Sequence, residues 1–169
     1  MLFALMVLAA APSAAYPDPI APAASGKVQC YAPTDHKTCA SLAGYTAAPD
    51  GTFATSAIVM LSNDPVVLMQ TVTEVRIKDG AVCGRVLKTD ITNGSLTLGG
   101  EAVPAGKAAP FLNKVAEHLA PIIGHDICTQ FVPDGDGFIA KATMDGEAQP
   151  DQDQKVIWIA PGDGYRVGP

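Results

Sequence analysis

The residues with the widest choice of chemistry are the cysteines, because thiols form cross-links, bind metals and act as nucleophiles. They are Cys30, Cys39, Cys83 and Cys128. The stretch VQCYAPTDHKTC (28–39) also places Asp35 and His36 between the first two. Structural zinc sites usually draw their ligands from close pairs such as C-x2-C, and no such pair is present. A C-x-x-C redox motif is also missing, so thioredoxin-like chemistry is not indicated.

An even number of cysteines in an exported chain predicts disulfides, because the compartment oxidises thiols. Of the three possible pairings we favour Cys30–Cys39, which are near in sequence, and Cys83–Cys128, each in an expected strand. The second bond would close a long loop and contribute roughly 4 kcal/mol in the chain-entropy model. We expect the first to pin a surface loop in which His36 is not a ligand. A metal site and free thiols are the alternatives.

The histidines and acidic residues do not form a recognisable site. His118 and His125 are seven positions apart, whereas a helical metal pair needs a spacing of four. The stretch PDGDGF (133–138) begins like a calcium loop, but Phe138 occupies a ligand position and the closing Glu is missing. The motifs G-x-S-x-G, H-E-x-x-H, S-x-x-K and a phosphate-binding loop are absent. The sequence therefore predicts no catalytic, cofactor-binding or metal-binding residues.

The start of the chain predicts export. An apolar run from Leu2 to Ala11 has the length of a signal-peptide core and is short for a membrane helix. Ser13 and Ala15 fit the positions before a signal-peptidase cut, so we predict a signal peptide at 1–15 and a periplasmic or secreted protein. An uncleaved anchor is the alternative. No later run is long enough to span a bilayer, so we expect no stable membrane insertion after the signal is removed.

The rest of the chain is expected to form a flexible arm at 16–26, rich in Pro and Ala, and one disulfide-containing domain at 27–169. The net charge is −6, and no basic stripe with interleaved aromatics is present. This composition argues against nucleic acid or an anionic membrane surface as a partner.

Asp-Gly and Asn-Gly pairs divide the domain into short runs with strand character. Apolar residues then recur on one helical face from Phe111 to Ile123, after Pro110. We therefore predict an α+β domain, in which an antiparallel β-meander carries one amphipathic helix at about 110–123 packed on the sheet, followed by three more strands. The expected strands are 52–61, 66–78, 81–91, 95–103, 126–132, 138–144 and 155–160.

The sequence does not name a biochemical function, but it ranks three classes. The favoured class is a small exported, non-catalytic domain that binds a protein or envelope component. The alternatives are an enzyme whose site is assembled across the fold and a secreted protease or enzyme inhibitor, which would present the loop between Cys30 and Cys39. A panel of protease assays would separate the inhibitor, and a deep pocket lined by His or carboxylates would indicate the enzyme.

Overall fold

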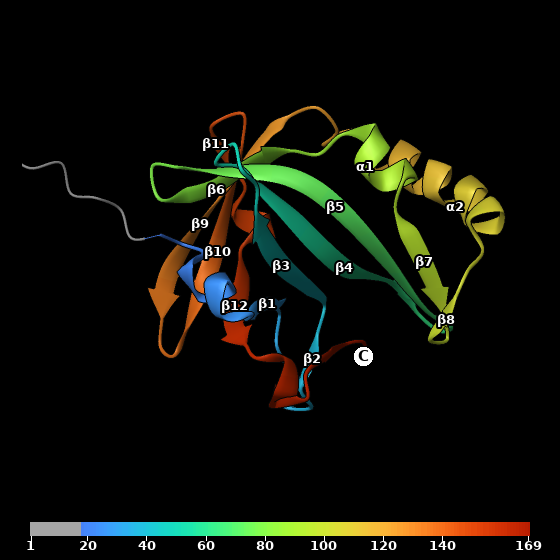
Figure 1. The fold of residues 1–169 in the computed structure, drawn as a ribbon, viewed down its shortest axis with the longest axis horizontal. Helices are drawn as coiled ribbons and strands as arrows, with labels where there is room; N and C mark the ends of the chain where they lie inside the picture. Colours follow the sequence, from blue (N-terminus) through green and yellow to red (C-terminus); the bar gives the residue numbers. More distant parts are fainter. Residues whose placement is uncertain (1–17) are drawn as a thin grey trace, which may run out of the picture.

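The computed structural model describes residues 18–169 and is mostly β. Eight antiparallel strands close into a barrel in the order β4-β3-β1-β12-β10-β9-β6-β5, and the pairing of β5 with β4 completes the ring (Figure 1). The ring strands are β1 (Val28–Tyr31), β3 (Ser41–Ala47), β4 (Phe53–Asn63), β5 (Val66–Lys78), β6 (Ala81–Arg85), β9 (Asp126–Asp134), β10 (Gly137–Met144) and β12 (Gln154–Ile159).

The predicted antiparallel sheet with a helix packed against it is confirmed, but the α+β class is wrong. The strands that the sequence analysis did not expect are β1 and β3, and they connect β12 to β4. Without them the strands would form an open sheet with two edges. Closure leaves the barrel strands without free edges, which would otherwise pair with other chains.

Side chains alternate between the inside and the outside of the barrel, and β5 displays this period clearly. Its outward side chains are exposed, namely Gln70, Val72, Glu74, Arg76 and Lys78. Its inward side chains are only partly buried, namely Thr71, Thr73, Val75 and Ile77. The cross-strand pairing places Thr55 on β4, Tyr45 on β3 and Gln29 on β1 on this same inner face. The interior is therefore lined by polar and aromatic side chains as well as apolar ones.

One end of the barrel wall continues beyond the ring and is covered by helices. Residues 86–125 connect β6 to β9, and they contain α1 (Lys88–Thr92), β7 (Ser95–Leu98), β8 (Glu101–Ala102) and α2 (Ala105–His118). In Figure 1 these elements lie at the right, over the far ends of β4 and β5. The apolar core of this helix-covered end consists of Met69, Ile91, Leu96, Ala108, Leu112 and Ala116, with partly buried residues such as Val59 and Val115 around it.

The helix starts and ends five residues earlier than the predicted range of 110–123. Pro110 lies inside α2 rather than in its first turn, and Pro104 occupies the N-cap position. The buried face of α2 is formed by Ala108, Leu112 and Ala116. Phe111, by contrast, is 44% exposed. The sequence pattern was misread because alanine is small and weakly apolar, so Phe111 dominated the predicted face.

Two further predicted ranges changed. The expected strand at 81–91 is split, with β6 ending at Arg85 and α1 beginning at Lys88. The expected strand at 95–103 is a hairpin of β7 and β8 that turns at Gly99 and Gly100, both of which have positive φ. By contrast, β5 has the predicted bounds, and its hairpin with β6 turns at Asp79-Gly80 as expected.

A second apolar cluster lies on the outer face of the barrel around the Cys30–Cys39 disulfide, which is buried. Ile159 completes its buried part. Two short strands, β2 (Thr38–Cys39) and β13 (Arg166–Val167), pair in parallel beside it. The remaining elements are η1 (Ala21–Ser25), β11 (Glu147–Ala148), η2 (Pro150–Gln152) and η3 (Pro161–Asp163).

The N-terminal predictions fall partly outside the described residues. The signal peptide at 1–15 lies there entirely, as does the start of the arm at 16–26. The described part of the arm packs on the domain through Ile20, which is 3% exposed, and continues as η1. A composition rich in Pro and Ala concealed this single anchoring residue. None of the helices within residues 18–169 is long and apolar enough to span a bilayer.

Candidate functional site: a charged cleft on the barrel wall

A cleft with a volume of about 620 Å³ lies on the outer wall of the barrel. We call it the outer cleft. Strands β5, β6 and β9 form its floor and walls, and the segment leading into α1 forms its rim. Its lining residues are Glu74, Arg76, Lys78, Cys83, Gly84, Arg85, Leu87, Asp90, Asp126 and Cys128.

The register of the three strands brings these residues together. Arg76 lies opposite Cys83 across β5 and β6, and Cys83 lies opposite Cys128 across β6 and β9. The Cys83–Cys128 disulfide therefore runs across the floor of the outer cleft. Gly84 allows the close approach of β5, because a Cβ at this position would come within 2.8 Å of the Glu74 carbonyl oxygen.

The charges in the outer cleft are only partly paired. Arg85 donates to Asp126 Oδ1 from both Nε (3.0 Å) and Nη2 (2.7 Å). Asp90 Oδ2 accepts the backbone N–H of Leu87 at 2.9 Å, which caps the start of α1. Among residues 18–169, Arg76 and Lys78 form no ion pair shorter than 4 Å. The lining therefore carries three cations and three carboxylates, and Arg76, Lys78 and Glu74 are its charged side chains without an ion pair or a hydrogen bond in the described chain.

A second charged group adjoins this cleft through Asp126. The Asp145 carboxylate accepts the Asp126 backbone N–H at 2.9 Å through Oδ1, and its Oδ2 lies 2.6 Å from His125 Nδ1. The hydrogen bond with His125 and that from the Asp126 N–H lower the pKa of Asp145 below its ordinary value. His125 lies beyond the end of α2 at His118 and bonds to Asp145.

The reactive groups in and beside the outer cleft are a disulfide and a histidine–carboxylate pair. Both sulfurs in the cleft are joined in a disulfide, so neither is a free nucleophile. The His125–Asp145 pair is half-exposed on both sides, and no hydrogen bond in the described chain joins its other ring nitrogen to a hydroxyl or thiol. Within residues 18–169 no group of three or more His, Cys, Asp or Glu is placed to hold a metal ion.

Apolar side chains are exposed at the edge of the outer cleft. Leu87 on its rim is 48% exposed. Val72, two residues before Glu74 on the same face of β5, is 55% exposed. Val72 also lines a second, smaller cleft of about 380 Å³ between β5 and the region of α1, and Asp90 lines both clefts. The two clefts therefore adjoin along the outside of β5.

The disulfides are Cys30–Cys39 and Cys83–Cys128, which is the pairing that the sequence favours. Two disulfides are typical of proteins in oxidising compartments outside the cytoplasm. His36 is exposed in the loop between Cys30 and Cys39, and His118 is exposed at the end of α2, so neither is near the outer cleft. The sequence analysis singled out only the two cysteines of this cleft. Its charged residues come from segments about 50 positions apart, and the alternating exposed residues of β5 are the signal that could have indicated them.

The chain matches no protein-family model, no curated protein and no solved structure.

Proposed function

We propose that the chain is a non-catalytic periplasmic or secreted binding domain, and that the outer cleft receives an acidic segment of a partner protein. The observation that carries this proposal is that Arg76 and Lys78, two cations without an ion pair among the described residues, line the outer cleft of a chain whose net charge is −6. Cations that have no carboxylate partner of their own can pair with the carboxylates of an acidic segment.

The shape and stiffness of the outer cleft support a protein partner. Leu87 and Val72 add exposed apolar surface beside the charges, and protein interfaces combine an apolar centre with a polar rim. The floor is held by the Cys83–Cys128 disulfide and by the pairing of β6 with both β5 and β9. A rigid site loses little conformational entropy on binding, which favours affinity.

A defined acidic peptide, hexaglutamate, tests the proposal by titration with the purified domain. Binding should weaken as the salt concentration rises from about 50 to about 300 mM, because salt screens the attraction between exposed charges. Arg76→Glu combined with Lys78→Glu should lower affinity at least about tenfold, since both attractions become repulsions.

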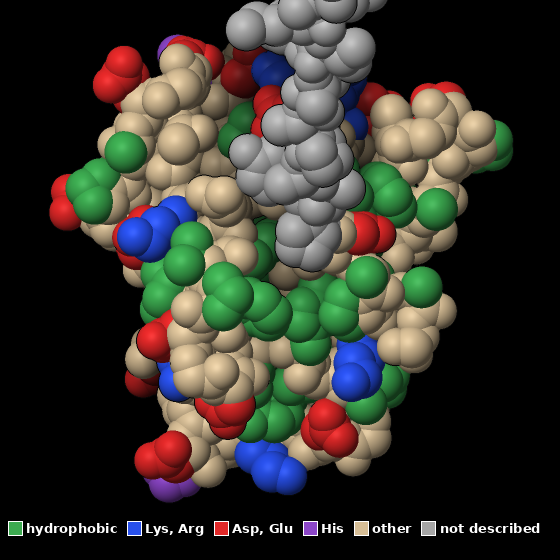
Figure 2. Space-filling model, turned by 90° about the vertical axis from the view of Figure 1, so that its left-hand side faces the viewer, with side chains coloured by type: hydrophobic (Ala, Val, Ile, Leu, Met, Phe, Trp, Pro, Cys, Tyr) green, Lys and Arg blue, Asp and Glu red, His purple; other side chains and the backbone are tan. Residues whose placement is uncertain are grey.

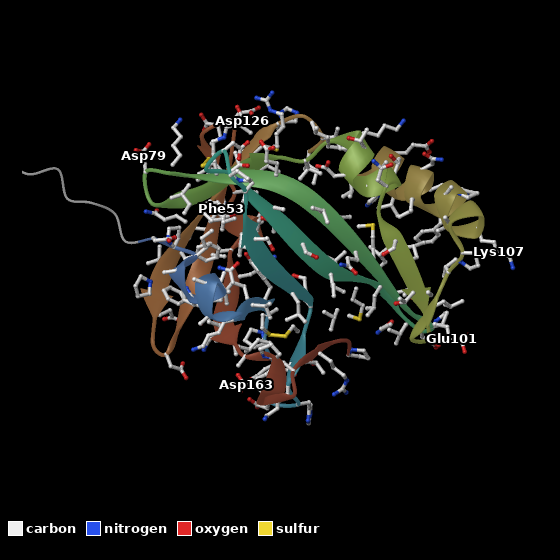
Figure 3. The ribbon with its side chains drawn as sticks, viewed as in Figure 1. Phe53, Asp79, Glu101, Lys107, Asp126 and Asp163 are labelled. Carbon is white, nitrogen blue, oxygen red and sulfur yellow. A yellow bond between two sulfur atoms is a disulfide. The ribbon has the colours of Figure 1, made fainter. Side chains whose placement is uncertain are left out.

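The matched control is Lys107→Glu combined with Lys114→Glu, which makes the same change of charge on α2. Both lysines are exposed, and Figure 3 places Lys107 at the helix-covered end, far from Asp126 beside the outer cleft. Affinity in the control should change less than about twofold. Equal losses in both double variants would reject the outer cleft as the site.

The His125–Asp145 pair supports one second candidate, an enzyme that uses His125 as a general base. A carboxylate on Nδ1 orients a histidine and supports proton transfer at Nε2. Hydrolase assays on ester, peptide and phosphate substrates test this candidate. An activity that is retained in His125→Ala would not belong to this pair.

A further inference from the structure

The interior of the barrel holds polar groups whose hydrogen bonds are not all made. Gln29 is fully buried on β1. Its Oε1 accepts two hydroxyl groups, from Tyr31 at 3.0 Å and from Tyr45 at 2.7 Å. Both lone-pair directions of this oxygen are therefore used, and the carboxamide is held in one orientation.

The donor end of the same carboxamide has no partner. Gln29 Nε2 is buried and makes no hydrogen bond, and the same is true of Thr55 Oγ1 on β4. Tyr45 lies directly opposite Thr55, and Gln29 lies opposite Ala43, two positions from Tyr45 on β3. The two unpartnered groups therefore share one stretch of the inner wall. Native proteins leave few buried polar groups unpaired, and a bound molecule is one common reason for them.

Several inward side chains of the wall beside these groups retain contact with solvent. The inward side chains of β4 and β5 next to Thr55 are only partly buried, including Ala57, Thr71, Thr73 and Val75. In a barrel whose interior is filled, inward side chains are shielded from solvent. Eight-stranded barrels are also of the size that can hold one small ligand. This stretch therefore has both the polar groups and the access that a ligand needs.

The chemistry of this wall selects an uncharged ligand. Its inward residues from β1, β3, β4, β5 and β12 are Gln29, Tyr31, Ala43, Tyr45, Thr55, Ala57, Thr71, Thr73, Val75, Val156 and Trp158. None of them carries a charge at neutral pH, and burial raises the pKa of Tyr31 to about 12. An ionised ligand would lose its hydration without gaining a counter-charge.

The aromatic residues indicate the rest of the ligand. The rings of Tyr45 and Trp158 lie 6.3 Å apart between centroids, at an interplanar angle of 51°. Aromatic surfaces of this kind pack well against planar or apolar groups. The Nε2 of Gln29 donates, and the Thr55 hydroxyl can donate or accept.

We propose that the barrel interior binds a small uncharged molecule in which a carbonyl or amide group hydrogen-bonds to Gln29 Nε2 and Thr55 Oγ1, while a planar or apolar body packs beside Tyr45 and Trp158. This site is separate from the outer cleft and does not depend on it.

Trp158 is the only tryptophan of the chain, so its fluorescence reports on this site alone. The probes are benzamide and acetophenone, which are neutral, and benzoate and benzylammonium, which have a similar ring but a charge. We expect a saturable change of Trp158 emission, and of the Gln29 side-chain amide resonances in NMR, with at least one neutral probe. Both charged probes should bind at least about tenfold more weakly, because the site offers no counter-charge.

Thr55→Val tests the anchor, because it replaces only the unpartnered hydroxyl by a methyl group of similar size. We expect benzamide or acetophenone to bind at least about fivefold more weakly, with an unchanged or higher melting temperature. The control is Thr46→Val on β3, which is exposed and should not alter binding. The proposal is overturned by three results: neither signal saturates with a neutral probe, charged and neutral probes bind equally, or Thr55→Val binds as the parent chain does.

Discussion

The molecule has two enclosed regions that share strands β4 and β5 but are lined by different kinds of side chain. Beneath α2, the core residues Met69, Leu96 and Leu112 are apolar and buried. Within the barrel, Gln29 and Thr55 bring polar groups inside, and several inward side chains remain in reach of solvent. Apolar burial stabilises a fold, whereas burying unpaired polar groups destabilises it.

This difference indicates a division of roles. The helix-covered end and the two disulfides stabilise the chain, and the barrel interior is free to carry hydrogen-bonding groups. The charged side chains on the surface are not divided between the two regions in this way. On the face shown in Figure 2, hydrophobic side chains form a band across the middle, and Lys, Arg, Asp and Glu side chains are interspersed around it. The contrast is therefore internal, and changes inside the two regions test it best.

The largest effect should come from the Cys83–Cys128 bond, which joins β6 to β9 at the base of the helix-covered segment. Replacing both Cys83 and Cys128 by Ser should lower the free energy of unfolding by about 4 kcal/mol, because the bond closes a loop with a sequence separation of 45. Urea unfolding of the double variant without reductant measures this loss. A loss of less than about 1 kcal/mol would mean that strand pairing and packing hold β6 and β9 together without the bond.

Leu112→Ala should cost nearly as much, about 2–5 kcal/mol, because it removes a side chain that is 2% exposed in the apolar core. The control is Phe111→Ala, which changes the neighbouring residue on the exposed side of α2 and should cost about 1 kcal/mol or less. Chemical unfolding of both variants gives the comparison. Similar losses of unfolding free energy in the two variants would mean that the buried face of α2 is assigned wrongly.

Alkaline pH should act on the barrel interior and spare the apolar core. Burial raises the pKa of Tyr31 to about 12 from the ordinary 10.0, and it also raises the pKa of Tyr45. Between pH 10 and 12 the unfolded state therefore loses these protons first, and stability falls as pH rises. Each tyrosine should contribute a slope of about 1.4 kcal/mol per pH unit in this window.

Unfolding curves at several pH values measure this slope. Tyr31→Phe and Tyr45→Phe should each make it shallower, although removing a hydroxyl that bonds Gln29 lowers stability at neutral pH. Tyr165→Phe, outside the barrel, serves as the control and should leave the slope as it is. If the slope in both interior variants equals that of the parent chain, the tyrosines are not its cause.

The smallest effect is expected at Thr55, and its sign is informative. Thr55→Val removes a buried hydroxyl without a partner, so the free energy of unfolding should stay within about 0.5 kcal/mol or rise. Thermal unfolding of the ligand-free domain checks this expectation. A loss above about 1.5 kcal/mol would imply that the hydroxyl is hydrogen-bonded in solution, for example to a fixed water.

The sequence predicted those elements whose local signal is strong. β5 was predicted with its observed bounds because apolar and polar residues alternate along it and Asp79-Gly80 forms the turn that follows. β3 was missed because SLAGYTA contains small residues and a glycine, which weaken the strand pattern. Barrel closure depends on β3, so the fold class could not be obtained without it.

The candidate site was harder to predict than the fold. The disulfide of the outer cleft could be inferred from the even number of cysteines, since each has few possible partners. The proximity of Arg76, Arg85 and Asp126 depends on the pairing of β5, β6 and β9, which no local pattern encodes. Gln29 is a single polar residue in a short strand, and only the closed barrel makes it an interior group.

The position of the Cys83–Cys128 bond also changes how damage to the chain would be detected. It lies where residues 86–125 leave and rejoin the barrel wall, so a protease cut at the Gly99-Gly100 turn would leave two fragments covalently joined. Such a nicked molecule would migrate near the intact mass on a non-reducing gel and would separate only after reduction. Exposed turns are favoured cleavage sites. In an environment rich in proteases, this bond would keep a broken covering segment attached to the barrel.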